Sequence, residues 1–433
     1  MTGDEIAVIG VAGRFPGAAD VGEFWRNLCD AVDSSGAPTP GVTDFDAGFF
    51  GFDERQAIDT DPQHRMFLEV AWQAVEDSGY PPGALPLRAG VFASTSVNQY
   101  LIMRLLAGDR HHPPHQTPDH LPARVAYRLG ARGPAIAVQT ACSGSLVAVC
   151  LAAQSLLDYR CDLAVAGGSS VDLPGFPHPH TGLVSPDGVC RAFDRNARGA
   201  GFGSGAGAVV LRRLADAVAG GDQIRAVLRG WAVSNDGADR GGYAVPGVAG
   251  QATAVAEALA AAELSAADVG YVEGHGSGTL LGDAIEVAAL RRVFGANRAF
   301  LGSVKSNIGY LDAASGIAGL LKAVLMVQHG QIPASLHFVE PNPEADFGPL
   351  VVPVKTRPWS EAAGSEEAGS EPAGSEATGT DGLRIAGVSA FGMGGTNAHV
   401  VVAEPPAARG WRTPVPGYPF QRRRYWVDGV VAP

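Results

Sequence analysis

At residues 139–146 the chain reads QTACSGSL, with an apolar run at 135–138 before it and an Ala/Leu-rich run at 145–157 after it. The first run predicts a buried strand and the second predicts a helix, so the turn between them has the layout of a nucleophile elbow. Cys142 would then lie at a helix N-terminus, where the positive end of the dipole favours a thiolate and lowers the thiol pKa. On this pattern alone, Cys142 is either a nucleophile or a small buried residue at a tight turn.

Short β-branched runs alternate with longer Ala/Leu-rich stretches along the rest of the chain. Strands are predicted at 6–9, 135–138, 163–166, 208–211 and 400–402, and helices at 69–76, 145–157, 250–261, 284–292 and 314–329. This alternation predicts an α/β fold with a largely parallel core. The strands lack polar alternation, which favours a sheet covered on both faces.

The composition argues against several classes of protein. Of the 433 residues, 46% are hydrophobic and 18% are charged, as is ordinary for a globular protein with a large interior. A formal net charge of −12 argues against a nucleic-acid-binding face, which would be basic. No run of about 18 apolar residues predicts a membrane span, and the N-terminus lacks the basic region of a signal peptide. We therefore expect a cytoplasmic protein.

The cysteines and histidines do not predict a structural metal. The five cysteines are odd in number and form no CxxC pair, which argues against both a disulfide framework and a zinc site. Six histidines fall in Pro-rich stretches that predict solvated loops more readily than a metal site: His111, His112, His115, His120, His178 and His180.

A histidine flanked by glycines occurs at 273–279, where the chain reads EGHGSGT. The glycines leave the ring of His275 accessible to a ligand, and Ser277 and Thr279 add hydroxyls from the same loop. A structural turn is the alternative interpretation.

Two further stretches carry polar groups or glycines in a useful context. KSNIGY at 305–310 precedes the helix predicted at 314–329. FGMGGTNAH at 391–399 has glycines that free backbone N–H groups, as an oxyanion hole requires.

Together, these stretches resemble the β-ketoacyl synthase family, in its modular polyketide synthase branch. The resemblance covers nearly the whole chain, and its blocks follow the order of the family: IAVIGVAGRFPGA, DPQHRMFLEVAWQAVEDSG, QTACSGSLVAV, SPDGVCRAFD, VEGHGSGTLLGD, GSVKSNIGYLDAASG and FGMGGTNAHVV. It implies a thiolase fold, with two similar αβ halves in a layered αβαβα arrangement, normally as a homodimer. It also implies an acyltransferase that binds no cofactor and receives its substrate on the phosphopantetheine of an acyl carrier protein.

On this basis we expect an N-terminal half at 1–260, a C-terminal half at 261–405 and a tail at 406–433. Residues 361–380 repeat Ala-Gly-Ser-Glu and predict a disordered insertion. The tail contains GYPFQRRRYW at 417–426, which resembles the linker that follows the acyltransferase of modular enzymes, and we expect it to lie extended on a surface. Few residues precede the first predicted strand and no acyltransferase or carrier domain follows, so we expect a freestanding ketosynthase.

The resemblance implies a role for each matching residue. Cys142 matches the acyl-accepting cysteine, and His275 matches the first active-site histidine. Lys305 matches a lysine that organises the site, with Glu286 as its charged partner. The remaining roles are an oxyanion hole made by the backbone N–H groups of Cys142 and Met393, and phosphopantetheine or substrate contacts made by Ser277, Thr279, Asn307 and Phe391.

Tyr310 stands where the family has a second active-site histidine. In elongating ketosynthases the two histidines bind the extender carbonyl and promote the loss of carbon dioxide. A phenol has a reference pKa of about 10, against about 6.5 for imidazole, so Tyr310 can donate a hydrogen bond but is a poor base near neutral pH. The resemblance therefore predicts acyl loading on Cys142 and puts decarboxylative condensation in doubt.

Four functions remain open. In the first hypothesis Cys142 takes an acyl chain and His275 acts on it, giving ring closure by aldol or acyl attack without decarboxylation. The second is transfer of the chain between carriers without elongation, and the third is decarboxylative condensation with Tyr310 in place of histidine. The fourth is a non-catalytic partner of the chain-length type, a class that typically lacks the nucleophile.

Overall fold

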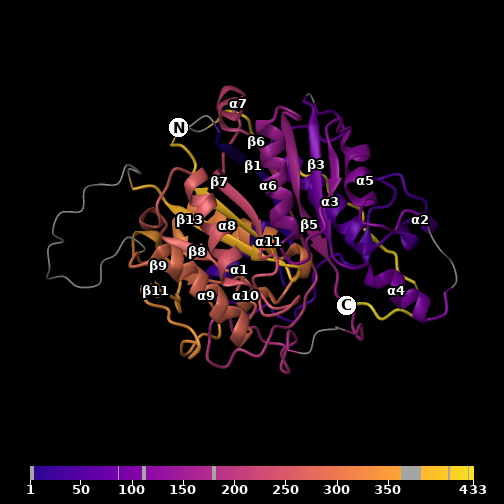
Figure 1. Cartoon of the computed structure of the whole chain (residues 1–433). Helices are drawn as coiled ribbons and strands as arrows, with labels where there is room; N and C mark the ends of the chain where they lie inside the picture. The colour runs from indigo at the N-terminus through magenta and orange to yellow at the C-terminus, as the bar shows by residue number, and fades with distance from the viewer. Residues whose placement is uncertain are drawn as a thin grey trace.

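The computed structural model describes residues 4–85, 87–109, 114–177, 182–361, 382–407, 410–427 and 429–433. Its centre is a sheet of eleven strands with helices on either side (Figure 1). Apart from Glu361, the insertion predicted at 361–380 lies outside the described residues, as do His111, His112, His178 and His180.

The strands of the sheet form two sets that follow one another in the chain. Across the sheet, the first set is β1 (Ile6–Arg14), β6 (Gly205–Arg213), β5 (Leu163–Ser170), β3 (Ala89–Thr95) and β4 (Ala135–Ala137). The second set is β7 (Ala226–Asn235), β14 (Thr396–Ala403), β13 (Ile385–Phe391), β8 (Tyr271–Glu273), β9 (Ala299–Gly302) and β11 (Leu350–Val351).

The two sets have the same internal order. In each, the first two pairings are antiparallel (β1–β6–β5 and β7–β14–β13) and the next two are parallel (β5–β3–β4 and β13–β8–β9). Among the described strands, three residue pairs join the sets, where β1 meets β7: Ile6 with Leu228, Ala7 with Val227 and Val8 with Ala226. The molecule therefore consists of two similar halves, a duplication that the sequence does not reveal.

The prediction of a largely parallel core is wrong, because half of the neighbouring strand pairs in the eleven-stranded sheet of the described residues are antiparallel. The physical reason is that helices cover both faces of this sheet. Its antiparallel strands are therefore as continuously apolar as its parallel strands, and the sequence pattern does not separate the two.

The helices form three layers around the two halves of the sheet. On the first half, α3 (Pro62–Asp77) and α5 (His120–Leu129) form the outer layer. On the second half, α8 (Val248–Ala261) packs on β7 and β14, with α9 (Leu280–Phe294) beside it. Between the halves lie α6 (Gly144–Leu157) and α11 (Ser315–His329), which contact each other. The result is the layered αβαβα arrangement of a thiolase fold, as predicted.

The remaining elements are short or peripheral. They are α1 (Val21–Cys29), α2 (Glu54–Asp59), α4 (Gln99–Leu106), α7 (Leu214–Ala219), α10 (Lys305–Ile308), β2 (Asp44–Phe45), β10 (Gln331–Ile332), β12 (Arg357–Pro358) and β15 (Arg423–Arg424). Within the described residues, no helix combines the length and the hydrophobicity of a membrane span.

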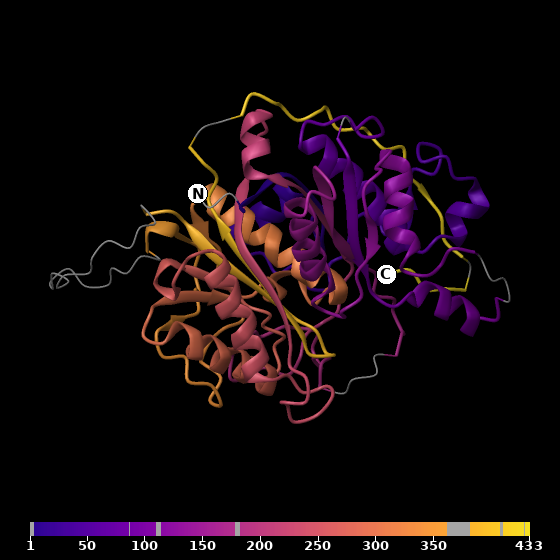
Figure 2. The same cartoon turned by 45° about the horizontal axis from the view of Figure 1, so that its top comes forward.

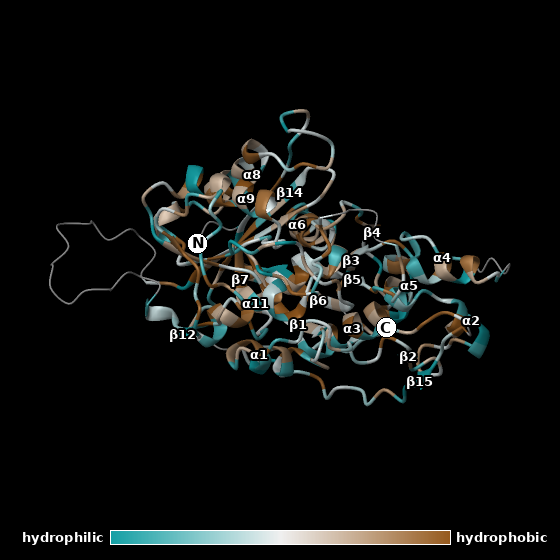
Figure 3. Cartoon of the chain, turned by 90° about the horizontal axis from the view of Figure 1, so that it is seen from below, coloured by the Kyte–Doolittle hydropathy of each residue, from teal (hydrophilic) through white to brown (hydrophobic). Residues whose placement is uncertain are grey.

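The two central helices are buried because they are apolar on almost every side. In α11, 13 of the 15 residues are buried. Its one buried charge, Lys322, pairs with Glu273 of β8 at a distance of 2.8 Å, which satisfies the requirement that a buried ammonium have a charged partner. Hydrophobic residues concentrate in these central elements, whereas hydrophilic residues lie mostly at the periphery (Figure 3).

Strand pairing divides the chain between α7 and β7, near residue 225. The sequence-based division at residue 260 lies later, in the last turn of α8. The difference arises because β7 and α8 begin the second half, and the apolar pattern contains no break that marks this point.

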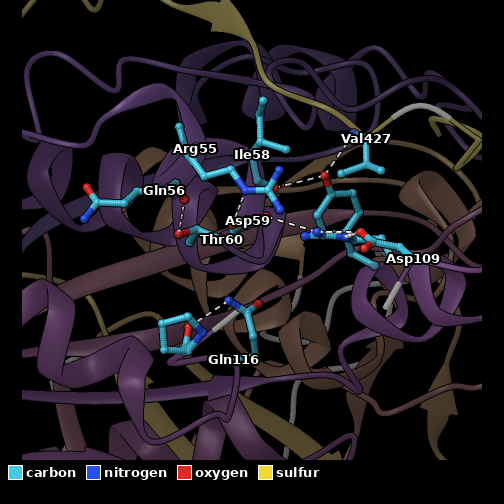
Figure 4. A network of polar contacts seen from close by, with 12 residues as sticks. Arg55, Gln56, Ile58, Asp59, Thr60, Asp109, Gln116 and Val427 are labelled. Atoms are coloured by element: carbon cyan, nitrogen blue, oxygen red, sulfur yellow. Dashed lines mark hydrogen bonds and ion pairs between the residues drawn. The ribbon is translucent and has the colours of Figure 1, made fainter. Parts of the chain in front are cut away.

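The tail runs extended across the first half, as the sequence predicts (Figure 2). Its strand β15 pairs with β2, and Arg422 binds the carboxylate of Glu69 at 2.7 Å. Near its end, the backbone N–H of Val427 donates to the hydroxyl of Tyr100, which donates to the carbonyl of Ile58 (Figure 4). The tail is thus tied to β2, α3 and α4.

Candidate active site

The nucleophile elbow predicted from the sequence is present between β4 and α6. Ala141 has a φ of 54°, a left-handed conformation that is costly for a residue other than glycine and recurs at functional sites. Gly144 begins the helix, and a Cβ there would lie 2.1 Å from the hydroxyl oxygen of Ser94. The close approach of Ser94 favours glycine at this position, and the turn holds Cys142 at the N-terminus of α6 with only 6% of its surface exposed.

Three groups from the second half surround the thiol of Cys142. The sulfur lies 3.7 Å from a carboxylate oxygen of Asp312, and the phenol of Tyr310 is close enough to lower the pKa of the thiol. The ammonium of Lys305 lies with its Nζ 5.5 Å from the centre of the Tyr310 ring, and its charge also acts on the thiol of Cys142. Sequence reasoning does not single out Asp312, although its place two residues after Tyr310 was an available signal.

The expectation of a lowered thiol pKa is wrong for the free enzyme. Burial, followed by the charge of Asp312, raises the pKa of Cys142 to about 12. The hydrogen bond from Tyr310, the charge of Lys305 and the backbone N–H of Met393 act in the opposite direction but do not offset the burial. The resting residue is therefore a thiol, because the desolvation that raises its pKa outweighs the effect of the helix N-terminus, which lowers it.

His275 is neutral at physiological pH. Burial and the nearby charge of Lys305 hold its pKa well below 6.5. Its Nδ1 accepts a hydrogen bond of 3.4 Å from the backbone N–H of Phe391, so Nε2 carries the proton of the neutral ring. The ring centre lies 6.1 Å from that of Tyr310. His275 can therefore donate a hydrogen bond to a carbonyl placed beside the thiol.

Glu286 and Lys305 both hold the His275 loop, but they do so through its backbone. The carboxylate of Glu286 accepts the N–H groups of His275 and Gly276 at 2.6 and 2.7 Å. The ammonium of Lys305 donates to the carbonyl of His275. The ion pairs within the described part of the chain do not include one between Glu286 and Lys305. Instead of pairing directly as expected, both side chains bind the backbone of the His275 loop.

The two hydroxyls predicted to contact phosphopantetheine lie together. The side-chain oxygens of Ser277 and Thr279 are 3.0 Å apart, and Ser277 also reaches the carboxylate of Asp283 at 3.5 Å. Burial raises the pKa of Asp283 to about 7.

The glycine-rich loop between β13 and β14 closes over the elbow. A Cβ on Gly392 would lie 2.2 Å from the carbonyl oxygen of Thr140, so only glycine permits this approach. The approach brings the backbone N–H of Met393 to the sulfur of Cys142. Met393 and Cys142 both line the cavity, and the role of Met393 as an oxyanion-hole donor remains a prediction.

A cavity of about 320 Å³ opens onto these groups. Its walls come from both halves and are lined by Cys142, Gly182, Leu183, Ala244, Val245, Pro246, Gln251, His275, Ser277, Thr279, Leu281, Gly282, Glu286, Tyr310, Phe391, Gly392 and Met393.

Asn307, predicted to contact the substrate, is not among the lining residues of this cavity in the described part of the chain. It is 1% exposed, its carbonyl accepts the N–H of Ser34 at 2.7 Å, and its side-chain oxygen accepts the hydroxyl of Ser306 at 3.2 Å. It lies behind the site, because the short helix α10 turns it inward.

Comparison with known proteins identifies the class of this site. The model of the β-ketoacyl synthase N-terminal domain matches residues 3–40 and 30–217, and that of the β-ketoacyl synthase C-terminal domain matches 225–339. The chain belongs to the β-ketoacyl synthase family, and it is a ketosynthase of the modular polyketide synthase type.

Curated relatives and solved structures agree with this class. The chain is 43% identical to one of the phenolphthiocerol/phthiocerol polyketide synthase subunits of Mycobacterium tuberculosis, a match covering 93% of this chain and 29% of that protein. It is 42% identical to another of these subunits from the same organism, covering 93% of this chain and 27% of that protein. The chain therefore spans less than a third of the length of these relatives.

Two solved ketosynthases have the same fold. One is an oxazolomycin ketosynthase domain of Streptomyces albus, with a TM-score of 0.84 and 34% identity, covering 93% of this chain and 75% of that one. The other is the ketosynthase from module 6 of the bacillaene synthase of Bacillus subtilis, with a TM-score of 0.81 and 34% identity, covering 93% and 72%.

Proposed function

We propose that this ketosynthase takes an acyl chain from the phosphopantetheine of an acyl carrier protein onto Cys142 and then closes a ring within the bound chain, without decarboxylation. The observation that carries the proposal is the position of Tyr310, which lines the same cavity as Cys142 with its phenol close enough to the sulfur to lower the pKa of the thiol. A donor engaged with the nucleophile is not free to polarise the carbonyl of an extender unit.

Loading is a transfer between two thioesters. The sulfur of Cys142 forms a bond to the thioester carbonyl carbon, the bond from that carbon to the pantetheine sulfur breaks, and the thiol proton ends on the pantetheine sulfur. The backbone N–H groups of Cys142 and Met393 stabilise the oxyanion that forms between these steps. Tyr310 supports the developing thiolate with its hydrogen bond.

Ring closure would use the same carbonyl-binding groups. In the aldol case a carbon of the chain attacks a second carbonyl, and the proton that this carbon loses ends on the new hydroxyl. In the acyl case a hydroxyl of the chain attacks the thioester, its proton ends on the sulfur, and the product leaves Cys142. In both cases His275 donates a hydrogen bond from Nε2 to the carbonyl under attack.

Tyr310 is itself a poor base. Burial and the neighbouring Cys142 and Asp312 hold its pKa well above 10. It therefore stays protonated throughout the physiological range, which supports a reaction that needs a neutral donor more than one that needs a second imidazole.

Two alternatives share the loading step. Transfer without elongation needs nothing beyond Cys142 and the oxyanion hole, and condensation would rely on His275 and Lys305 alone. The non-catalytic alternative is disfavoured because Cys142 is present and opens onto the same cavity as His275 and Met393.

Intact-mass measurement separates these outcomes. The protein is mixed with an acyl carrier thioester, and the masses of protein, carriers and released product are followed over time. Acyl attack predicts an adduct on the protein that is then released as a free lactone. Aldol attack leaves the mass of the adduct unchanged, so the chain is hydrolysed from the protein and its retention time is compared with that of the uncyclised acid. A chain that appears unchanged on a second carrier indicates transfer, and release of carbon dioxide from malonyl carrier indicates elongation.

We further propose that the ketosynthase pairs with a second copy of itself through the edge of the first half. β4 is the last strand of the sheet and has only one neighbour among the described strands, and Ile136 within it is 44% exposed. Tyr127 of the adjacent α5 is 77% exposed. An unpaired edge with apolar side chains favours pairing with another strand. Light scattering of the native protein and of Ile136→Lys tests this, because the variant should be a monomer.

A further inference from the structure

One polar side chain of the cavity has no role in the chemistry described so far. Gln251 is near the N-terminus of α8, is 1% exposed and lines the same cavity as Cys142. Its amide oxygen is buried and has no hydrogen-bond partner among the described residues. Buried amides are almost always paired, because an unpaired one destabilises the fold, so this oxygen points to a ligand that supplies the missing partner.

The local structure holds Gln251 in place. The hydroxyl of Ser234 donates to the carbonyl of Gly250 at 2.7 Å, and the carboxylate of Asp236 accepts the N–H of Gly247 at 3.1 Å. A Cβ on Gly250 would lie 2.1 Å from Asp236. The first turn of α8 is therefore fixed against β7, and the unpaired amide does not result from a loose segment.

The cavity around Gln251 defines the chemistry of this ligand. Val245, Pro246 and Leu281 give it apolar walls, and Ser277 and Thr279 place two hydroxyls on another wall. An apolar cavity with a few neutral polar groups favours a neutral, extended ligand. The amide oxygen needs a donor from that ligand, and the amide nitrogen offers two donors of its own. A secondary amide, with one N–H and one C=O, matches both.

We propose that Gln251 pairs with an amide of the phosphopantetheine arm while the arm delivers its chain to Cys142. The assignment rests on the proposed function, in which the arm enters this cavity. The arm carries two secondary amides and would be held from two sides, by Gln251 on α8 and by the hydroxyls of Ser277 and Thr279. Gln251 is thus a substrate-positioning residue that binds the carrier arm and makes no contact that depends on the acyl chain.

The test varies the amides of the donor and keeps the acyl group constant. Loading of Cys142 is timed by intact mass with an acyl pantetheine thioester, an acyl N-acetylcysteamine thioester and a simple alkyl thioester, which carry two, one and no amides. Gln251→Leu should lower the loading rate from the pantetheine thioester about tenfold, as loss of one well-formed hydrogen bond would, and leave the alkyl thioester unaffected. Gln251→Met, which keeps the unbranched shape, should behave in the same way.

The melting temperature separates this role from a structural one. Replacing an unpaired buried amide with an apolar side chain should leave the melting temperature unchanged or raise it. Gln328→Leu is the matched control, since the amide oxygen of Gln328 is also buried without a partner among the described residues but does not line the cavity.

Three results would overturn the assignment. The first is an equal loss of rate with all three thioesters, and the second is no loss with the pantetheine thioester. The third is a loss that appears only when the acyl chain carries a hydroxyl, which would assign Gln251 to the acyl group. Failure of the native protein to load Cys142 from any thioester would be distinct, because it would remove the proposed function as well.

Discussion

The two halves of this ketosynthase have the same strand order and carry different chemistry at matching places. In the first half, residues 138–143 connect β4 to the central helix α6 and supply only the nucleophile, Cys142. In the second half, residues 303–314 connect β9 to α11 and supply Lys305, Tyr310 and Asp312. Because α6 and α11 lie against each other, these two connections meet, and the longer one surrounds the thiol that the shorter one presents.

The loops after β3 and β8 show the same division. After β8 comes His275, whereas Ser96 follows β3 and donates its hydroxyl to Ser170 at 2.8 Å. In the proposed mechanism the first half thus positions the reactive atom and one oxyanion donor, and the second half provides the other groups that set its protonation and bind the carbonyl. The duplicated fold makes the site possible because it brings together unlike loops that lie far apart in the chain.

The largest effect should come from removing the one reactive atom of the first half. Cys142→Ala should abolish the acyl adduct, since among the described cysteines only this sulfur lies in the cavity beside the oxyanion donors. Cys190→Ala is the matched control, because burial also raises the pKa of Cys190 to about 12 but the residue does not line the cavity. An adduct of the same mass on the Cys142→Ala protein would show that Cys142 is not the nucleophile, and the contrast drawn between the two halves would then fail.

The second effect concerns the side chain that the second half places against the sulfur. Tyr310→His should speed the release of carbon dioxide from malonyl carrier thioester by roughly 10²–10³, the value of one restored contact to the carbonyl in the transition state. The measurement is carbon dioxide release by the native protein and by the variant, with Tyr310→Phe to isolate the loss of the hydroxyl. Rapid release by the native protein would favour elongation. No gain from Tyr310→His would indicate a site altered beyond this residue.

A smaller effect is expected from the charge of Asp312. This carboxylate raises the pKa of Cys142, so Asp312→Asn should lower that pKa and increase the thiolate fraction at any pH below it. Removing one nearby like charge shifts a pKa by about 1 unit, so loading at pH 8 should be about tenfold faster. In both proteins the loading rate should rise with pH between about 6 and 9, with the variant curve displaced to lower pH.

The control for this experiment is Asp346→Asn, which removes a carboxylate that is 83% exposed and does not line the cavity. Slower loading by Asp312→Asn at every pH would contradict the electrostatic explanation. It would indicate instead that the carboxylate takes the thiol proton during loading.

The sequence predicts those parts of the site that local chain geometry determines. The elbow at Cys142 follows from a strand, a glycine turn and a helix, and the loops carrying His275 and Met393 follow from their glycines. The contact between Asp312 and the thiol depends on how closely α6 and α11 approach, which no local pattern encodes. The raised pKa of Cys142 has the same origin, because burial is a property of the assembled halves. The predicted strand directions are wrong for a related reason, since both faces of the sheet are covered.

The smallest effect should come from the largest difference in length between the halves. In the first half, residues 158–162 connect α6 to β5. In the second half, residues 330–384 connect α11 to β13 and include the insertion predicted at 361–380. That insertion is rich in Gly, Ser and Glu and lacks the large apolar side chains that could add to either core. Replacing 362–380 with a short Gly/Ser linker should therefore leave the melting temperature and the loading rate of Cys142 nearly unchanged. Differential scanning calorimetry and the intact-mass assay measure both, and keeping Glu361 preserves its ion pair with Arg357.

A fall in melting temperature of several degrees would mean that the insertion contributes to the fold. A lower rate only with carrier-bound substrate, and not with a small thioester, would place it in the docking of the carrier protein.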